Sequence, residues 1–230
     1  MRTIGLVGGM SWESTAVYYR LLNTLARERL GGLHSAEILL RSIDFAPLAS
    51  LQEAGDWDAA GAMLGDAAAA LARAGAHNVL ICSNTMHLVA ATVAARPGVR
   101  LIDVIDATAA AVAEAGCRRP LLLATAYTME HGFYHERMAR HGVQAQVPGA
   151  ADRAVTHAII FKELCRGIID AGSRARLLEV VARGLEAGAD SVILGCTELC
   201  LLLDPATFGC PGFDSTLIHA HAAIADALAG

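Results

Sequence analysis

Two segments of this chain end an apolar run in a cysteine that polar residues follow. The first spans residues 79–85 (VLICSNT) and the second spans residues 191–198 (SVILGCTE). An Ala-Gly-Ala sequence precedes each segment, and these two sequences are 113 residues apart, whereas Cys82 and Cys196 are 114 residues apart. The second copy therefore carries one extra residue before its cysteine, which we assign to Gly195. The duplication predicts two thiols that face each other across one small-molecule site.

A pair of thiols suits proton transfer at carbon. Removing the Cα proton of an amino acid and returning a proton to the other face inverts the configuration, which requires a general base on one side and a general acid on the other. A thiolate and a thiol can fill these two roles. A helix N-terminus lowers a cysteine pKa from its usual value of about 8.5, and a helix is expected to begin after both Cys82 and Cys196.

A single cysteine at a strand end is more often a small buried apolar residue than a catalyst. The shared context of Cys82 and Cys196 favours the catalytic interpretation for this pair. The other cysteines lack that context and are predicted to be structural: Cys117, Cys165, Cys200 and Cys210. No Cys-x-x-Cys sequence occurs, which argues against a zinc knuckle or a redox motif.

The histidines give weaker signals. His87 follows the first cysteine motif and leaves a Cys/His nucleophile open. His131 and His135 have the i, i+4 spacing of metal ligands on a helix, but no third ligand stands out, so a solvated helix face is favoured and no metal is expected. His219 and His221 are expected on the surface of a helix.

A glycine turn follows the first expected strand, at residues 3–7. Gly8 and Gly9 lead into a helix from about residue 13 to residue 30. Such a turn can bind a small anion, because free backbone N–H groups and the helix dipole meet there. The spacing is not that of a dinucleotide site. A carboxylate site and a tight turn without a ligand both stay open.

Apolar strands and amphipathic helices alternate along the chain. Further strands are expected at 36–43, 99–104, 120–124, 143–147 and about 209–213, and the helices expected after the first include 57–74, 86 to about 95, 129–141, 154–169, 173–187 and 216–229. The segment 44–52 is expected to be a loop. This order predicts an α/β fold with two pseudo-symmetric lobes, each a mostly parallel sheet flanked by helices, and an active site in the cleft between them. The first lobe is expected to hold residues 1–98 plus about 206–230, and the second to hold residues 99–205.

Composition narrows the functional classes. Hydrophobic residues make up 54% of the 230 residues and charged residues 18%, which is typical of a globular chain. The net charge of −5 and the scattered basic residues argue against nucleic acid as a partner. No apolar run reaches the roughly 18 residues of a membrane span, and no signal peptide is recognised. A cytoplasmic, reducing location with six free thiols is the expectation.

Three motifs together resemble the aspartate/glutamate racemase family, and most closely its broad-specificity amino-acid racemases. They are residues 4–15 (IGLVGGMSWEST), 82–87 (CSNTMH) and 195–198 (GCTE). The resemblance implies a racemase that needs no pyridoxal phosphate, other cofactor or metal, with Cys82 and Cys196 as its acid/base pair. It also implies an amino-acid substrate and a homodimer.

The resemblance further implies which residues line the pocket. Asn84, Thr85 and Thr197 have groups that can bind an α-carboxylate, and Glu198 can bind an α-ammonium. Lys162 is a further candidate that would supply a positive charge. The complete set of expected substrate-binding residues is Met10, Gln52, Ser83, Asn84, Thr85, Thr125, Thr128, Lys162, Thr197 and Glu198.

One feature departs from the family pattern. Aspartate-specific members carry an arginine after the second strand, where it can bind the side-chain carboxylate. The segment 44–52 has no arginine here, and Gln52 is the nearest polar residue. Strict aspartate specificity is therefore not expected. An aspartate/glutamate-type racemase and one of broad specificity, which would include a neutral polar amino acid, both stay open. The alternatives are a related isomerase, hydantoin racemase or decarboxylase of small acids on the same fold, and a protein that binds an amino acid without turning it over.

Overall fold

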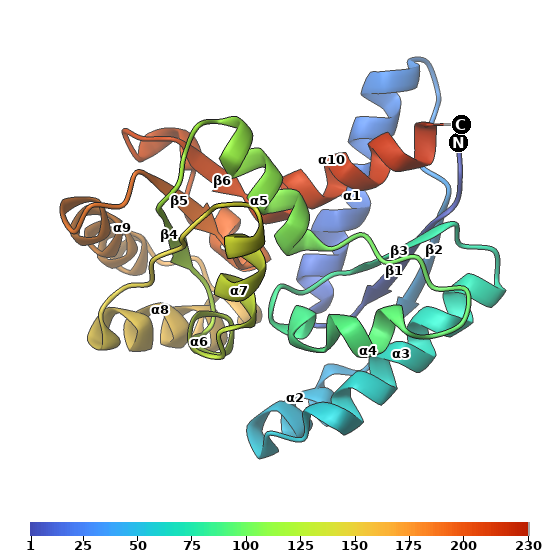
Figure 1. Cartoon of the computed structure of the whole chain (residues 1–230), viewed down its shortest axis with the longest axis horizontal. Helices are drawn as coiled ribbons and strands as arrows, with labels where there is room; N and C mark the ends of the chain where they lie inside the picture. Colours follow the sequence, from blue (N-terminus) through green and yellow to red (C-terminus); the bar gives the residue numbers. More distant parts are fainter. Residues whose placement is uncertain (230) are drawn as a thin grey trace. The chain divides into compact units, whose positions relative to one another are not determined.

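The computed structural model describes residues 1–229, which form two compact units (Figure 1). Unit 1 contains Met1–Val104 together with the residues from His219 onward, and unit 2 contains Ile105–Ile218. The chain leaves unit 1 at the start of helix α5 (Val104–Glu114) and returns to it within helix α10 (Ser215–Leu228). Each of these two helices therefore belongs to both units.

Unit 1 is built on a parallel sheet of three strands. They are β1 (Ile4–Gly8), β2 (Ile38–Ser42) and β3 (Asn78–Ile81), in the order β2-β1-β3. A single bridge between Val79 and Leu101 extends the sheet beyond β3. The other helices of unit 1 are α1 (Trp12–Leu30), α2 (Phe45–Ala54), α3 (Trp57–Arg73), the 3₁₀ helix η1 (Thr85–Val89) and α4 (Ala90–Ala94).

The two faces of this sheet pack against different helices, because successive side chains of a strand point to opposite faces. Val79 and Ile81 lie in the apolar cluster that contains the buried face of α3. Leu80 and Cys82 lie in the cluster formed with α1 and α10. The strand that carries Cys82 is thus fully buried, as its unbroken apolar sequence predicts.

Unit 2 is built on a second parallel sheet. Its strands are β4 (Pro120–Leu123), β5 (Ser191–Leu194) and β6 (Gly212–Asp214), in the order β4-β5-β6. A bridge between Leu121 and Gln146 extends it beyond β4. The helices that unit 2 holds besides the shared ones are α6 (Ala126–Glu130), α7 (Phe133–Arg140), α8 (Ala150–Lys162), η2 (Leu164–Arg166), α9 (Ala171–Glu186), η3 (Thr197–Leu201) and η4 (Pro205–Thr207).

The two sheets share one topology once the bridges are included. Unit 1 reads β2, β1, β3 and Leu101, and unit 2 reads Gln146, β4, β5 and β6. In each unit the cysteine strand lies third and follows a long helix, α3 or α9. The predicted α/β class with two parallel sheets is confirmed. β6 pairs with β5, however, so this strand lies in the second sheet, whereas residues from about 206 were expected in the first lobe.

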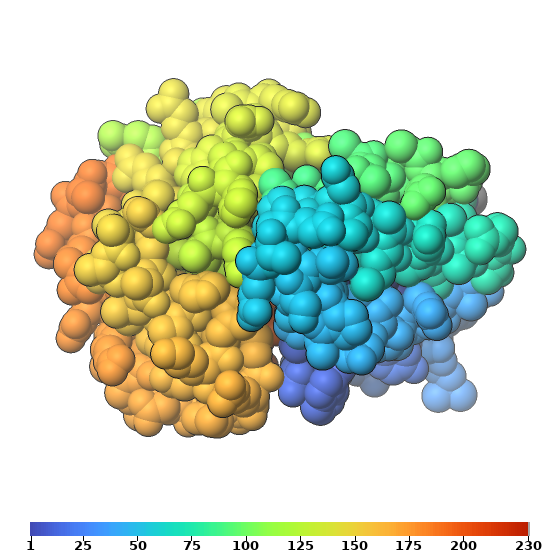
Figure 2. Space-filling model, turned by 90° about the horizontal axis from the view of Figure 1, so that it is seen from below, coloured from blue at the N-terminus to red at the C-terminus, as the bar shows by residue number. Residues whose placement is uncertain are grey.

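Several expected elements differ from the structure. The segment 44–52 is not a loop, because residues from Phe45 form α2, and the Asp44 side chain accepts a hydrogen bond from the amide of Ala46. Pro47 does not prevent this helix, since it lies in the first turn, where a backbone N–H has no partner in the helix. The end of α2 and the start of α3 are mostly exposed and form the cyan surface in Figure 2.

Two other expected elements are shorter than predicted. Residues 99–104 contribute only the bridge at Leu101, and α5 already begins at Val104. The helix expected over 129–141 is divided into α6 and α7 at Gly132, which has a φ of 78°. A residue with positive φ ends a right-handed helix, and glycine adopts that conformation readily.

The glycine turn after β1 is held by Thr15 of α1. The amide of Gly9 donates to Thr15 Oγ1 at 2.8 Å, and this hydroxyl donates to the carbonyl oxygen of Ser11 at 3.1 Å. The Gly9 N–H is thus used within the fold, which favours the tight turn over an anion site at this residue. Gly9 has a φ of 94°, and a Cβ there would lie 2.1 Å from the carbonyl oxygen of Ile43.

Substituting Gly9 with alanine should therefore destabilise the protein strongly. We expect Gly9→Ala to lower the free energy of unfolding by about 3 kcal/mol or more, since the backbone of Ile43 must move. Gly55 provides the matched control, because it has the left-handed conformation (φ 70°, ψ 17°) but a Cβ there would meet nothing within 4 Å. Gly55→Ala should cost only about 1–2 kcal/mol. Urea unfolding followed by circular dichroism measures both, and equal losses would contradict this account.

Candidate active site

Cys82 follows β3 directly. Its amide donates to the carbonyl oxygen of Val7 at 2.9 Å, which fixes it beside the end of β1. Its side chain is fully buried in the cluster that contains Tyr18 and Leu80. Burial raises the pKa of the Cys82 thiol, because an apolar environment disfavours the thiolate.

Polar residues continue the motif after Cys82. The Ser83 hydroxyl accepts a hydrogen bond from the amide of Met86 at 3.4 Å, and Asn84 and Thr85 are buried. The expected helix begins here only as η1, a 3₁₀ helix of five residues. The prediction that a helix N-terminus lowers the cysteine pKa is therefore wrong for Cys82, since burial dominates.

Met10 and Gln52 lie with this motif in unit 1. The amide nitrogen of Gln52 donates to the sulfur of Met86 at 2.9 Å, which joins α2 to η1. Met10 belongs to the same apolar cluster as Met86 and Leu48. Unit 1 thus brings together the expected pocket residues that precede and follow Cys82.

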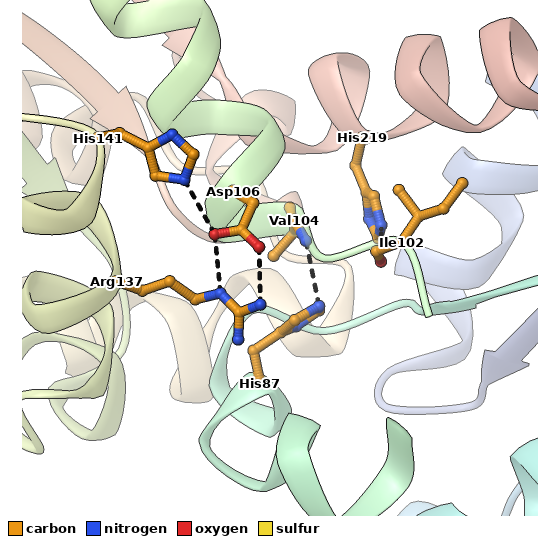
Figure 3. A network of polar contacts seen from close by, with 7 residues as sticks. All are labelled: His87, Ile102, Val104, Asp106, Arg137, His141 and His219. Carbon is orange, nitrogen blue, oxygen red and sulfur yellow. Dashed lines mark hydrogen bonds and ion pairs between the residues drawn. The ribbon is translucent and has the colours of Figure 1, made fainter. Parts of the chain in front are cut away.

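His87 and His219 are buried, and the structure gives both a role that the sequence did not show. His87 Nδ1 lies 2.8 Å from the carbonyl oxygen of Ser83. Its Nε2 accepts a hydrogen bond from the amide of Val104 at 3.2 Å, which Figure 3 shows. Since each ring nitrogen bonds to a backbone atom, the geometry does not support a Cys/His pair. His219 bonds to Ile102 and to the Tyr18 hydroxyl, so its expected surface position is wrong.

Burial lowers the pKa of His219 to about 3, with a further contribution from nearby His87. An unfolded histidine has a pKa of about 6.5. Stability from a buried neutral histidine is therefore fully present above about pH 6.5 and is lost as the pH falls toward the folded pKa.

The spacing of the apolar stripe of α10 could have identified His219 as buried, because it lies beside Ala220 and one turn before Ala223.

Cys196 occupies a different position at the end of its strand. In unit 2 the amide that bonds to the neighbouring strand belongs to Gly195, which donates to the carbonyl oxygen of Leu123 at 2.8 Å. Cys196 is one residue further on, in extended conformation. Its side chain therefore packs with Val192 and Leu194 on the α9 face of the sheet, whereas Cys82 packs on the face away from α3.

The Cys196 thiol has a charged neighbour. Its Sγ donates to Glu198 Oε2 at 2.9 Å, and the Thr197 hydroxyl donates to the same oxygen at 2.8 Å. All three residues are buried. Burial, and then the charge and hydrogen bond of Glu198, raise the pKa of Cys196 well above its usual value, with Cys165 as a further cause. η3 is short and 3₁₀, so the helix-dipole argument fails here too.

The remaining predicted site residues of unit 2 differ in their burial. Thr125 caps α6, because its hydroxyl accepts from the amide of Thr128 at 3.3 Å and lies 3.1 Å from the Thr128 hydroxyl. Both threonines are buried. Lys162 is exposed in the last turn of α8, whereas the residues around Cys196 are buried.

Other cysteines of unit 2 lie near the same cluster. Cys165 and Cys200 are partly buried and pack against the apolar cluster that contains Cys196. Burial and then the Asp214 carboxylate raise the pKa of Cys200. The spacing of these residues in the sequence did not indicate that they are neighbours. Cys165 lies in η2, Cys200 lies in η3 and Asp214 ends β6.

His131 and His135, for which a solvated helix face was favoured over a metal site, do not share a helix. His131 caps α6, and His135 lies in α7 beyond the break at Gly132. Within residues 1–229, no three His, Cys, Asp or Glu side chains are grouped as ligands of a metal ion. In the same range, no helix combines the length and apolar composition that a membrane span requires.

Comparison with known proteins places this arrangement in a family. A protein from Yersinia pestis proposed to be an Asp/Glu racemase is 44% identical, with a TM-score of 0.92 over 99% of this chain and 100% of its own. An aspartate racemase homologue from Pyrococcus horikoshii OT3 is 32% identical, with a TM-score of 0.86 over 99% of both chains. An aspartate racemase from Picrophilus torridus, 18% identical, shares the fold, with a TM-score of 0.77 over 99% of this chain and 94% of its own.

The family profile covers both units. The profile of Asp/Glu/Hydantoin racemases matches residues 7–223, a range that includes both cysteine motifs and the glycine turn. The two parallel sheets, each with a cysteine after one of its strands, are the structural counterpart of this match. The chain belongs to the Asp/Glu/Hydantoin racemase family.

Proposed function

We propose that this protein is an amino-acid racemase that works without pyridoxal phosphate or a metal, and that Cys82 and Cys196 exchange protons with the two faces of Cα. The observation that carries the proposal is the duplicated strand end. Each unit has a buried cysteine at the carboxyl end of its third strand, followed by buried polar residues. Ligands of parallel sheets bind at such ends.

The proton balance of the proposed reaction is simple. In one direction the Cys196 thiolate takes the Cα proton, and the Cys82 thiol gives its proton to the opposite face. Cys196 is then a thiol and Cys82 a thiolate, which is the state that runs the reverse direction. One proton must pass from Cys196 to Cys82 through solvent before the first direction can run again.

The two thiols differ in how they can lose a proton. Cys196 donates a hydrogen bond to Glu198, so this carboxylate is the group that can accept the thiol proton. Cys82 lies among apolar side chains. The α-ammonium group of an amino acid would stabilise either thiolate by charge, which offsets the effect of burial on both pKa values.

The substrate proposed is a neutral polar amino acid, or several amino acids. Asn84, Thr85 and Thr197 can bind an α-carboxylate through hydrogen bonds. Residues 45–54, which form α2, contain no arginine or lysine that could bind a side-chain carboxylate. Gln52 is the polar residue of α2 that is buried.

We also propose a homodimer and a cytoplasmic, reducing location. The six cysteines are free, which suits such a location. Trp12 and Tyr19 of α1 and Leu40 of the edge strand β2 are 68%, 55% and 48% exposed, and they line one hollow. A second copy of the chain can cover this apolar surface through a two-fold axis.

The dimer is tested by light scattering over a range of concentrations. The wild type should have twice the mass of one chain, and Trp12→Glu should shift it toward the monomer, since a carboxylate would be buried there. Leu33→Glu is the matched control, because Leu33 is fully exposed outside that hollow. A monomeric wild type, or equal effects of the two variants, would contradict this assembly.

Racemisation is tested by following optical rotation and deuterium uptake at Cα in D₂O for a panel of L- and D-amino acids. Cys82→Ser and Cys196→Ser should each lower the racemisation rate at least about a hundredfold, since each removes a general acid or base. Cys210→Ser serves as control and should keep the wild-type rate. Wild-type protein that binds a panel member in calorimetry without deuterium uptake would instead point to a binding protein.

Glu198→Gln tests the role given to the carboxylate. Removing its negative charge should lower the pKa of Cys196, because that charge disfavours the thiolate. The pH dependence of Cys196 alkylation, followed by peptide mass spectrometry, measures the change, with Cys82 in the same sample as the internal control. The racemisation rate should fall at the same time. An unchanged or raised Cys196 pKa would refute the assignment.

A further inference from the structure

His87 connects two backbone segments that the sequence separates by many residues. Ser83 follows Cys82, and Val104 is the first residue of α5 and the last of the first stretch of unit 1. The imidazole ring lies between the carbonyl oxygen of Ser83, at 2.8 Å, and the amide of Val104, at 3.2 Å. Figure 3 shows the contact with Val104. The ring is buried, so water does not compete freely for either contact.

These two contacts define the tautomer of His87. The Val104 amide can only donate, so Nε2 must be an acceptor without a proton. The Ser83 carbonyl can only accept, so Nδ1 carries the proton. His87 is therefore the neutral Nδ1–H form.

His219 has the opposite tautomer and supports the same segment. Its Nε2 lies 2.8 Å from the carbonyl oxygen of Ile102 and must donate, and its Nδ1 lies 2.8 Å from the Tyr18 hydroxyl. The two imidazole rings meet edge to face, with centroids 5.9 Å apart. Two buried histidines thus hold the segment from Ile102 to Val104: His219 bonds to Ile102 and His87 bonds to Val104.

The contacts close a ring of hydrogen bonds around Cys82. The amide of Ile102 donates to the carbonyl oxygen of Val79 in β3, three residues before Cys82. His87 closes the other side, from Val104 back to Ser83. The backbone on both sides of Cys82 is therefore tied to one and the same neighbouring segment.

We propose that His87 is a positioning residue that fixes the direction of the Cys82 thiol through the hydrogen bond from its Nδ1 to the carbonyl oxygen of Ser83. This proposal rests on the proposed function only in taking Cys82 as a reacting thiol. His87 itself has no free ring nitrogen for proton transfer with the substrate, because both are engaged with backbone atoms.

Two conservative substitutions separate the two contacts. In His87→Asn the side-chain amide nitrogen replaces Nδ1, so the bond to Ser83 is kept and the bond to Val104 is lost. In His87→Gln the side-chain oxygen replaces Nε2, so the bond to Val104 is kept and the bond to Ser83 is lost. If the Ser83 bond positions Cys82, the glutamine variant should show the larger effect.

The readout is the rate at which iodoacetamide alkylates each cysteine, followed by peptide mass spectrometry. One lost hydrogen bond should raise the Cys82 rate about five- to tenfold in His87→Gln, and His87→Asn should stay within about twofold of the wild type. Cys196 in the same samples should not change in either variant. Equal Cys82 rates in the two variants, or a parallel rise at Cys196, would overturn the proposal.

A spectroscopic measurement covers the case in which a variant fails to fold. In wild-type protein with ¹⁵N-labelled histidine, NMR should show a protonated Nδ1 for His87 and a protonated Nε2 for His219. A protonated Nε2 at His87 would overturn the proposal without any variant.

Measurements of racemase activity distinguish a failure of this proposal from a failure of the proposed function. In an active wild type, His87→Gln should lower kcat with little change in KM, and His87→Asn should retain most of kcat. A wild type without racemase activity would end the proposed function, whereas the alkylation rates and the tautomers would still decide the role of His87.

Discussion

The hydrogen bond from the Cys82 amide to the carbonyl oxygen of Val7 sets the geometry of the first candidate site. It is the last bond between β1 and β3 at the carboxyl edge of a parallel sheet. Because parallel strands end at the same edge, the bond brings the glycine turn after β1 and the polar motif after Cys82 together. The bond from Gly195 to Leu123 does the same for Thr125 and the motif after Cys196 in unit 2.

In unit 1 the cysteine itself makes this bond, whereas in unit 2 the residue before the cysteine makes it. This shift of one residue gives the two cysteines different chemical surroundings. Side chains alternate between the faces of a sheet, so one inserted residue moves a cysteine to the opposite face. Cys82 consequently packs among apolar side chains of α1 and α10. Cys196 lies on the α9 side and donates to Glu198. The duplicated motif thus places one thiol in an apolar cluster and the other beside a carboxylate.

The features that could be predicted from the sequence are those that depend on a local pattern of apolar residues. The strands that lead to Cys82 and Cys196 were found, because fully buried parallel strands have short, unbroken apolar runs. Gly195 was found as the extra residue because the two copies could be aligned. The helix at residues 45–54 was missed, since Pro47 suggests a loop until its place in the first turn is known. The roles of His87 and His219 depend on contacts with Val104 and Ile102, and no local pattern predicts such distant partners.

The sharing of α10 between the units has a consequence for synthesis on the ribosome. The core beneath α1 is completed by Ala223, Ile224 and Ala227, and the amide of Arg2 bonds to the carbonyl oxygen of Ala227. Unit 2, in contrast, is one continuous stretch of chain. Of the two units, unit 1 is therefore the first to be synthesised in part and the last to have its core completed, because the apolar face of α1 stays uncovered until α10 has emerged.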